Sequence, residues 1–274
     1  LHPRVRRQRQ MCIRDSSYTN DKEAKQTFKH TFKNERVTAK ISLQKQDKET
    51  KKAVPQGDAT LEKAVYGLYA REDIVHPDGA TGAVYKAGEQ VATLTTDKNG
   101  QASVDGLYLG NYYVKEITPP TGYLADEEEH DLVCNYEGDL VAEVKRDCLS
   151  LEQVMKQPFQ IIKAANNGKT DADLLKGAGF TAYLVSSLKV NEDGSYDFDS
   201  AKPVVIGENG ATEIFTDEKG YACSIAIPYG TYIVRETTTP HNYTPVDDFT
   251  VRITENNPNP VSYTHLTLPT NSRV

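Results

Sequence analysis

The stretch "TDKNGQASVDGLYLGNYYVKE", Thr96 to Glu116, decides the fold because the chain contains a second version of it. Laid over "TDEKGYACSIAIPYGTYIVRE", Thr216 to Glu236, it aligns without a gap. Each version has a glycine turn, a strand, a second glycine turn and a final strand with alternating side chains. Short β-rich runs between turns, with almost no helical periodicity, predict one β-sandwich per copy.

The final strand of the first copy carries an acid on its apolar face. Because successive side chains of a strand point to opposite faces, Glu116 shares a face with Tyr112 and Val114. The upstream segment "KISLQK" places Lys45 in phase with its apolar residues. A buried charge is costly unless it is paired or neutralised, so Lys45 should lie near Glu116, with both buried.

The second copy repeats this combination, with Glu236 in "YIVRE" and Lys163 in "PFQIIK". A plain buried salt bridge, or a lysine whose amine reaches solvent at the strand end, would explain one such pair. The recurrence of the pair in the same phase favours a shared chemical role.

Composition excludes several classes of protein. The chain has 274 residues and a formal net charge of -7, which argues against nucleic-acid binding. It has no apolar run of about 18 residues, so no membrane span is expected. Acidic stretches such as "DEEEHD" fit solvated loops, and no hydrolase or dinucleotide motif occurs, so we expect no metal and no cofactor. The cysteines outside the N-terminal tail, which holds Cys12, are expected to be buried free thiols: Cys134, Cys148 and Cys223.

Both ends of the chain differ in character from the rest. "LHPRVRRQRQMCIRDS" is dense in basic residues within an acidic chain, and both it and "VSYTHLTLPTNSRV" resemble translated cloning sequence. The expected organisation is a non-native tail at 1–17, the last strand of a truncated preceding domain at 18–36, β-sandwich domains at 37–156 and 157–260 joined by a short linker, the second without its last strand, and a non-native tail at 261–274.

Two phrases carry a family resemblance. "YYVKEITPPTGY" and "YIVRETTTPHNY" resemble the E-box (Tyr-x-Leu-x-Glu-Thr-x-x-Pro-x-Gly-Tyr) of SpaA-like, Cna-B-type domains in Gram-positive pilins and surface adhesins. Lys45-Gln46-Asp47 resembles the Lys-x-Asp of that family. The resemblance covers nearly all of 37–260 and implies tandem prealbumin-like, immunoglobulin-like β-sandwiches. In many members a first-strand lysine and a last-strand Asn or Asp form an intramolecular isopeptide bond beside the glutamate.

The resemblance implies that Lys45 and Lys163 are crosslink lysines and that Glu116 and Glu236 promote the bond. Burial lowers the pKa of a lysine, which frees the amine to attack. Burial also raises the pKa of a glutamate, which lets the acid polarise the acceptor and move protons. Such a reaction occurs at most once per molecule, so the chain is not expected to be an enzyme.

The crosslink acceptors depart from the family pattern. Asn34 occupies the acceptor position of a preceding domain whose lysine this chain lacks. The same spacing in the first copy falls on Glu152, which has a longer side chain and no ammonia to expel, while Asp147 or Asn135 would need a shifted register. The second copy is expected to lack its last strand. We therefore predict that neither copy forms a complete isopeptide bond.

The family resemblance implies a structural role, as a stalk or shaft repeat of an adhesin or pilin at the bacterial cell wall. The expected partners are neighbouring domains of the same surface protein. The alternative is an extracellular binding module whose loops contact host matrix protein or glycan, which an exposed aromatic cluster would favour. An extracellular enzyme would need a pocket with converging titratable groups, and the sequence predicts none.

Overall fold

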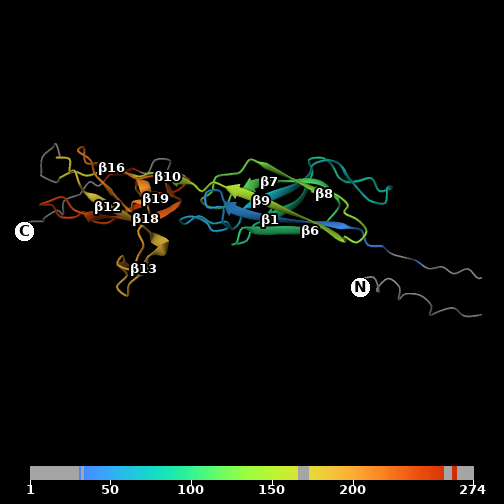
Figure 1. Ribbon diagram of the computed structural model, residues 1–274, viewed down its shortest axis with the longest axis horizontal. Coiled ribbons are helices and arrows are strands. Elements are labelled where there is room, and N and C mark those ends of the chain that lie inside the picture. Colours follow the sequence, from blue (N-terminus) through green and yellow to red (C-terminus); the bar gives the residue numbers. More distant parts are fainter. Residues whose placement is uncertain (1–30, 32–33, 166–172, 256–260, 264–274) are drawn as a thin grey trace, which may run out of the picture. The chain divides into compact units, whose positions relative to one another are not determined.

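The computed structural model of the chain describes residue 31 and residues 34–165, 173–255 and 261–263. Leu1–Glu35 and Arg36–Val274 form two units, and the second contains both copies of the repeat. The regular secondary structure in the described part of this unit is almost entirely β-strand (Figure 1). The predicted all-β fold class is therefore confirmed.

The first domain is a sandwich of two sheets. One sheet has the strand order β6-β1-β9 and the other β5-β2-β7-β8, with a separate β3-β4 hairpin. Ile41 and Leu43 of the first sheet pack against Leu68 and Val114 of the second in one buried apolar cluster. The strands are β1 (Thr38–Asp47), β2 (Val65–Ala70), β3 (Ile74–Val75), β4 (Ala83–Tyr85), β5 (Gln90–Thr95), β6 (Gln101–Leu107), β7 (Gly110–Thr118), β8 (Glu129–Cys134) and β9 (Glu143–Glu152).

The second domain repeats this plan around its own core. Its sheets have the orders β16-β11-β20 and β15-β12-β18-β19, and two short ladders, β10-β17 and β13-β14, accompany them. Ile161 of one sheet packs with Phe180 and Val234 of the other. The strands are β10 (Lys156–Gln157), β11 (Gln160–Ile162), β12 (Gly179–Leu184), β13 (Lys189–Val190), β14 (Tyr196–Asp197), β15 (Glu213–Phe215), β16 (Tyr221–Cys223), β17 (Ile227–Pro228), β18 (Gly230–Thr238), β19 (Phe249–Ile253) and β20 (Val261–Tyr263). Two 3-10 turns, η2 (Val185–Ser187) and η3 (Glu208–Gly210), interrupt the loops.

In both domains the first strand of the three-stranded sheet pairs in parallel with the last strand. β1 pairs with β9 from Thr38↔Glu143 to Asp47↔Glu152, and Figure 1 shows the blue β1 beside the yellow-green β9. Likewise, β11 pairs with β20. Residues 261–263 therefore complete the second domain, and the expectation that its last strand is missing does not hold. Ladder hydrogen bonds join backbone groups, so a segment of foreign composition can still pair as a strand.

Strand β1 explains how charged groups enter the core. Its side chains alternate between partly exposed and buried along the whole strand, as the period of two requires. The buried face begins with apolar residues and ends with Lys45 and Asp47, both 0% exposed. The end of β1 is thus where the chemistry of the first domain is concentrated.

Two cysteine predictions are confirmed and one is wrong. Cys134 and Cys148 are buried free thiols, whereas Cys223 is exposed. Cys223 lies on the solvent side of β16, where the burial alternates from residue to residue. Cys12 lies outside the described residues. Within the described part of the chain, no helix is long and apolar enough to cross a membrane.

Candidate functional site

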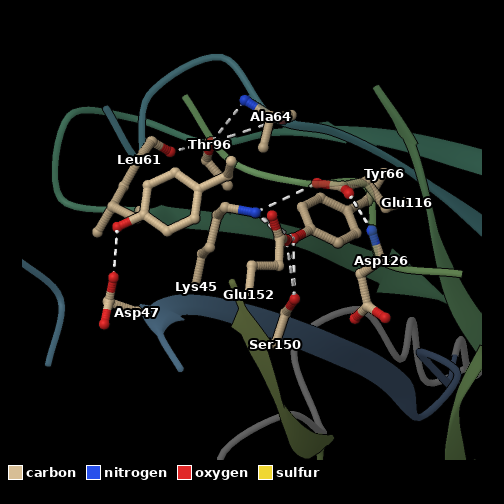
Figure 2. A network of polar contacts seen from close by, with 12 residues as sticks. Lys45, Asp47, Leu61, Ala64, Tyr66, Thr96, Glu116, Asp126, Ser150 and Glu152 are labelled. Carbon is tan, nitrogen blue, oxygen red and sulfur yellow. Dashed lines mark hydrogen bonds and ion pairs between the residues drawn. The ribbon is translucent and has the colours of Figure 1, made fainter. Parts of the chain in front are cut away.

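The first site is a buried cluster around the side chain of Lys45. The ammonium Nζ donates a hydrogen bond of 3.2 Å to Glu116 Oε1 and one of 3.2 Å to the hydroxyl of Tyr66. It also forms an ion pair with Glu152 Oε1. Figure 2 shows the Lys45 nitrogen directed at these three oxygens. The side chains of Lys45, Glu116 and Glu152 are at most 1% exposed.

Both glutamates are held by groups other than the lysine. Glu116 Oε2 accepts a hydrogen bond of 2.8 Å from the backbone N–H of Asp126. Glu152 Oε1 accepts one of 2.5 Å from the Tyr66 hydroxyl and one of 3.1 Å from Ser150 Oγ. Glu152 Oε2 is buried and has no hydrogen-bond partner among the described residues. The cluster therefore contains one buried carboxylate oxygen that accepts no hydrogen bond from the described residues.

Burial dominates the electrostatics of this site. Desolvation lowers the pKa of Lys45 to about 8, although the charge and hydrogen bond of Glu116 partly oppose this effect. Desolvation raises the pKa of Tyr66 far above its ordinary value. At neutral pH the Tyr66 hydroxyl is therefore protonated and donates a hydrogen bond to Glu152. A lysine near pKa 8 has a measurable fraction of free amine at neutral pH, which is the form that acts as a nucleophile.

Asp47 lies beside the cluster and has a different role. Its carboxylate accepts hydrogen bonds from the backbone N–H groups of Glu49 and Thr50 and from the side chain of Gln56. The hydroxyl of Tyr123 donates a further bond of 3.0 Å to Asp47 Oδ2. The Lys-x-Asp phrase and the final tyrosine of the E-box phrase therefore meet in space, and Asp47 stabilises the turn that follows β1.

The second domain contains a simpler version of the site. Lys163 Nζ lies 2.6 Å from Glu236 Oε2, with side-chain exposures of 4% and 0%. Glu236 Oε2 also accepts a bond of 2.8 Å from the backbone N–H of Val246, while its Oε1 is buried with no partner among the described residues. Phe180 occupies the place of Tyr66, because each pairs with the glutamate of its own domain.

The predicted Lys–Glu pairs are thus present and buried in both domains. The structure also brings Glu152 into the first cluster, because β9 runs parallel to β1 and places Glu152 opposite Asp47. Asn34 is exposed and lies outside any strand. The predicted last strand of a preceding domain at 18–36 falls largely outside the described residues.

The two alternative acceptors do not join the cluster. Asp147 is exposed on β9, and Asn135 is exposed just after β8. Sequence reasoning missed Tyr66 and Ser150. Only the register between strands shows that the Tyr66 hydroxyl meets an acid. No group of three metal-ligating side chains occurs among the described residues.

Tandem two-sheet sandwiches, each with a buried lysine–glutamate pair and parallel first and last strands, define a class of modular β-domain. Comparison with protein families supports this conclusion. The SpaA family, described as a prealbumin-like fold domain, matches residues 39–147 and 158–266. The chain belongs to this family, and the resemblance seen in the sequence is confirmed. No curated protein matches the chain.

The chain is similar to several solved structures, and the similarity to the first of those described here extends to the fold. The Bacillus anthracis TIE protein is 22% identical with a TM-score of 0.51, over 83% of this chain and 33% of that one. A streptococcal ancillary pilin is 24% identical with a TM-score of 0.31, over 84% of this chain and 63% of that one. GBS52, the minor pilin of Streptococcus agalactiae, is 17% identical with a TM-score of 0.34, over 86% of this chain and 100% of that one. The chain thus spans about a third of the length of the TIE protein.

Proposed function

We propose that this chain is a structural repeat of a bacterial surface protein, a stalk or shaft segment of a pilin or adhesin that transmits tension. Its partners are neighbouring domains of the same surface protein, and its place is outside the cell at the wall. Membership of the SpaA family supports this role, as do its structural neighbours, two of which are described as pilins. The observation that carries the proposal is the parallel pairing of β1 with β9.

Parallel pairing determines how a pulling force acts on the first domain. The chain enters at Thr38, leaves after Glu152, and the two strands pair along all ten residues of β1. Force between these points acts along the ladder, so its hydrogen bonds are loaded together in shear rather than broken one at a time. A domain that resists extension in this way suits a stalk.

The Lys45 cluster reinforces the same ladder from inside. Lys45 comes from β1, Glu116 from β7 and Glu152 from β9, so the cluster joins the first strand, the E-box strand and the last strand. Removing one partner of a buried ion pair leaves an unpaired charge and destabilises by about 3–5 kcal/mol. We infer that the cluster acts as an ionic clamp, with Lys45, Glu116 and Glu152 in the first domain and Lys163 and Glu236 in the second.

A force measurement tests the mechanical proposal. Handles attached at positions 38 and 153 load the β1–β9 ladder in shear, whereas handles at positions 38 and 143 open the same ladder from one end. We expect a several-fold higher unfolding force in the first geometry, and we expect Lys45→Met to lower it. Lys40→Met, on the partly exposed face of the same strand, is the matched control. Equal forces in the two geometries would contradict the proposal.

Intact mass tests whether the clamp is ionic or covalent. An amide between Lys45 and Glu152 would form by attack of Nζ on the side-chain carboxyl carbon, with one water released. We expect no loss of water or ammonia in either domain. A loss of one water that disappears in the Glu116→Ala variant would show instead that Glu152 serves as a crosslink acceptor.

One observation favours a ligand-binding role as a second candidate. A cleft of about 550 Å³ lies beside the β13–β14 hairpin, lined in part by Tyr196, Phe198 and Arg235. Tyr183 and Tyr196 pack edge-on against Phe198, and the Arg235 guanidinium lies 4.1 Å from the centre of the Phe198 ring. Aromatic faces beside charged groups suit a glycan. Titration with a panel of saccharides, compared with Phe198→Ala, tests this role, and no binding by the unaltered chain would exclude those ligands.

A further inference from the structure

A loop of the first domain contacts the second domain near the turn between β17 and β18, and one aspartate of this loop makes several of the hydrogen bonds. Asp58 lies in the loop between β1 and β2, and Tyr229 forms the turn between β17 and β18, which begins at Gly230. The Asp58 backbone N–H donates a hydrogen bond of 2.9 Å to the carbonyl of Tyr229. Asp58 Oδ2 accepts one of 3.0 Å from the Thr231 N–H, and Oδ1 accepts one from Ser186 Oγ. The carboxylate and the amide of one residue are therefore all engaged by the other domain.

We propose that this contact is a fixed joint, with Asp58 at its centre, that makes the two domains move as one body. Contacts between domains of one chain are often small and polar, so relative motion is the ordinary expectation. Here backbone groups on both sides are paired across the contact. Separation would leave the Thr231 N–H and the Tyr229 carbonyl without these partners.

An apolar contact also contributes to this joint between the domains. Tyr229 packs against a small buried cluster of the first domain, separate from the main core. The backbone N–H of Tyr229 donates a bond of 2.8 Å to the carbonyl of Met155, just before β10. The turn is thus held both by hydrogen bonds and by a ring placed on a preformed apolar surface. The cluster consists of Ala59, Leu61, Tyr123 and Val154.

Two glycines of the first domain permit this close approach. Gly57 has φ +60, and a Cβ at this position would lie 2.3 Å from the carbonyl oxygen of Tyr229. A Cβ at Gly122, whose φ is +83, would lie 2.8 Å from the Tyr229 ring. Both positions combine a backbone conformation that favours glycine with a lack of space for any side chain. The first domain is therefore shaped at two points to receive the turn.

Nuclear magnetic resonance on the full chain tests the joint. Residual dipolar couplings from the two domains should fit one alignment tensor, and the Thr231 amide should be protected from hydrogen exchange. The dipolar couplings of the Asp58→Ala variant should require two alignment tensors, one for each domain. Hydrogen exchange at the Thr231 amide should become faster by on the order of 10-fold or more, because its hydrogen bond to a charged acceptor is lost. Core amides at Leu68 and Val234 should keep their protection, which shows that both domains remain folded. Asp105→Ala, at an exposed position on β6, is the control.

A second variant tests the joint without removing a charge. Gly57→Ala should also separate the two alignment tensors. Gly79→Ala should not, because Gly79 has a similar φ of +68 but open space around it. Two tensors in the unaltered chain would overturn the proposal. Unchanged exchange at Thr231 in Asp58→Ala would show that Asp58 does not hold the joint.

Discussion

Replacing Tyr66 by phenylalanine removes one hydroxyl from the centre of the first cluster. That hydroxyl donates to Glu152 Oε1 at 2.5 Å and accepts from Lys45 Nζ at 3.2 Å. A hydrogen bond to a charged group contributes about 1.5–3 kcal/mol, and the ring itself is retained, so no large cavity forms. We expect Tyr66→Phe to lower the free energy of unfolding of the first domain by about 2–3 kcal/mol.

Tyr112→Phe is the matched control for this prediction. Both tyrosines are 0% exposed in the same core, but the Tyr112 hydroxyl donates to a neutral acceptor, the carbonyl of Tyr108, at 2.5 Å. Removing the Tyr112 hydroxyl should lower the free energy of unfolding by only about 1 kcal/mol. Because the chain has no tryptophan, urea unfolding is best followed by amide resonances assigned to each domain. If Tyr66→Phe destabilises no more than Tyr112→Phe, the hydroxyl does not hold the charged cluster and our account of it is wrong.

Two further predictions concern pH. Because burial lowers the pKa of Lys45 from 10.5 to about 8, with Glu116 partly opposing it, the unfolded chain binds more protons than the folded chain between these values. The lysine contribution to the free energy of unfolding should therefore rise by about 3 kcal/mol as the pH increases across this window. The free energy of unfolding in urea of the unaltered chain, minus that of the Lys45→Met variant, measures this contribution at each pH. Burial alone would raise the pKa of Glu49, but hydrogen bonds from Lys156, Gln56 and Gln153 lower it from 4.5 to about 2. The stabilisation from these bonds should be complete above pH 4.5 and lost as the pH falls toward 2. Glu49→Gln should therefore make the free energy of unfolding less sensitive to acid. An acid titration in which both proteins lose stability equally would contradict this.

The lysine–glutamate pairs were predictable because they depend only on the phase of side chains along single strands. A period of two places Lys45 among buried apolar residues, and the same rule applies to Glu116. A charge that must enter a core needs a partner, and each domain offers one such acid in the E-box phrase. Local pattern was therefore sufficient for this half of the site.

The contact of Glu152 with Lys45 depends on the register between strands about a hundred residues apart in sequence. A shift of one residue would turn the side chains of β9 to the opposite face, and no local pattern fixes parallel pairing over such a separation. The same limit explains why strand β20 was not expected. Its segment looks foreign by composition, while pairing with β11 is made through the backbone. Tyr66 was missed because its partner could be known only once that register was known.

The turn after β5, and its counterpart in the second domain, has a consequence for engineering. The Lys45 N–H donates 2.8 Å to the carbonyl of Gly100, and the Lys163 N–H donates 2.7 Å to that of Gly220. These glycines have φ of +72 and +64, and a Cβ on them would lie 2.8 Å and 2.3 Å from the carbonyl oxygens of the same two lysines. A lysine introduced alone into another β-sandwich would lack the backbone hydrogen bond to the glycine carbonyl, which fixes the position of the lysine in the core. The unit to transplant is therefore the lysine strand together with its glycine turn, and a search for further copies of this module should require the glycine as strictly as the lysine.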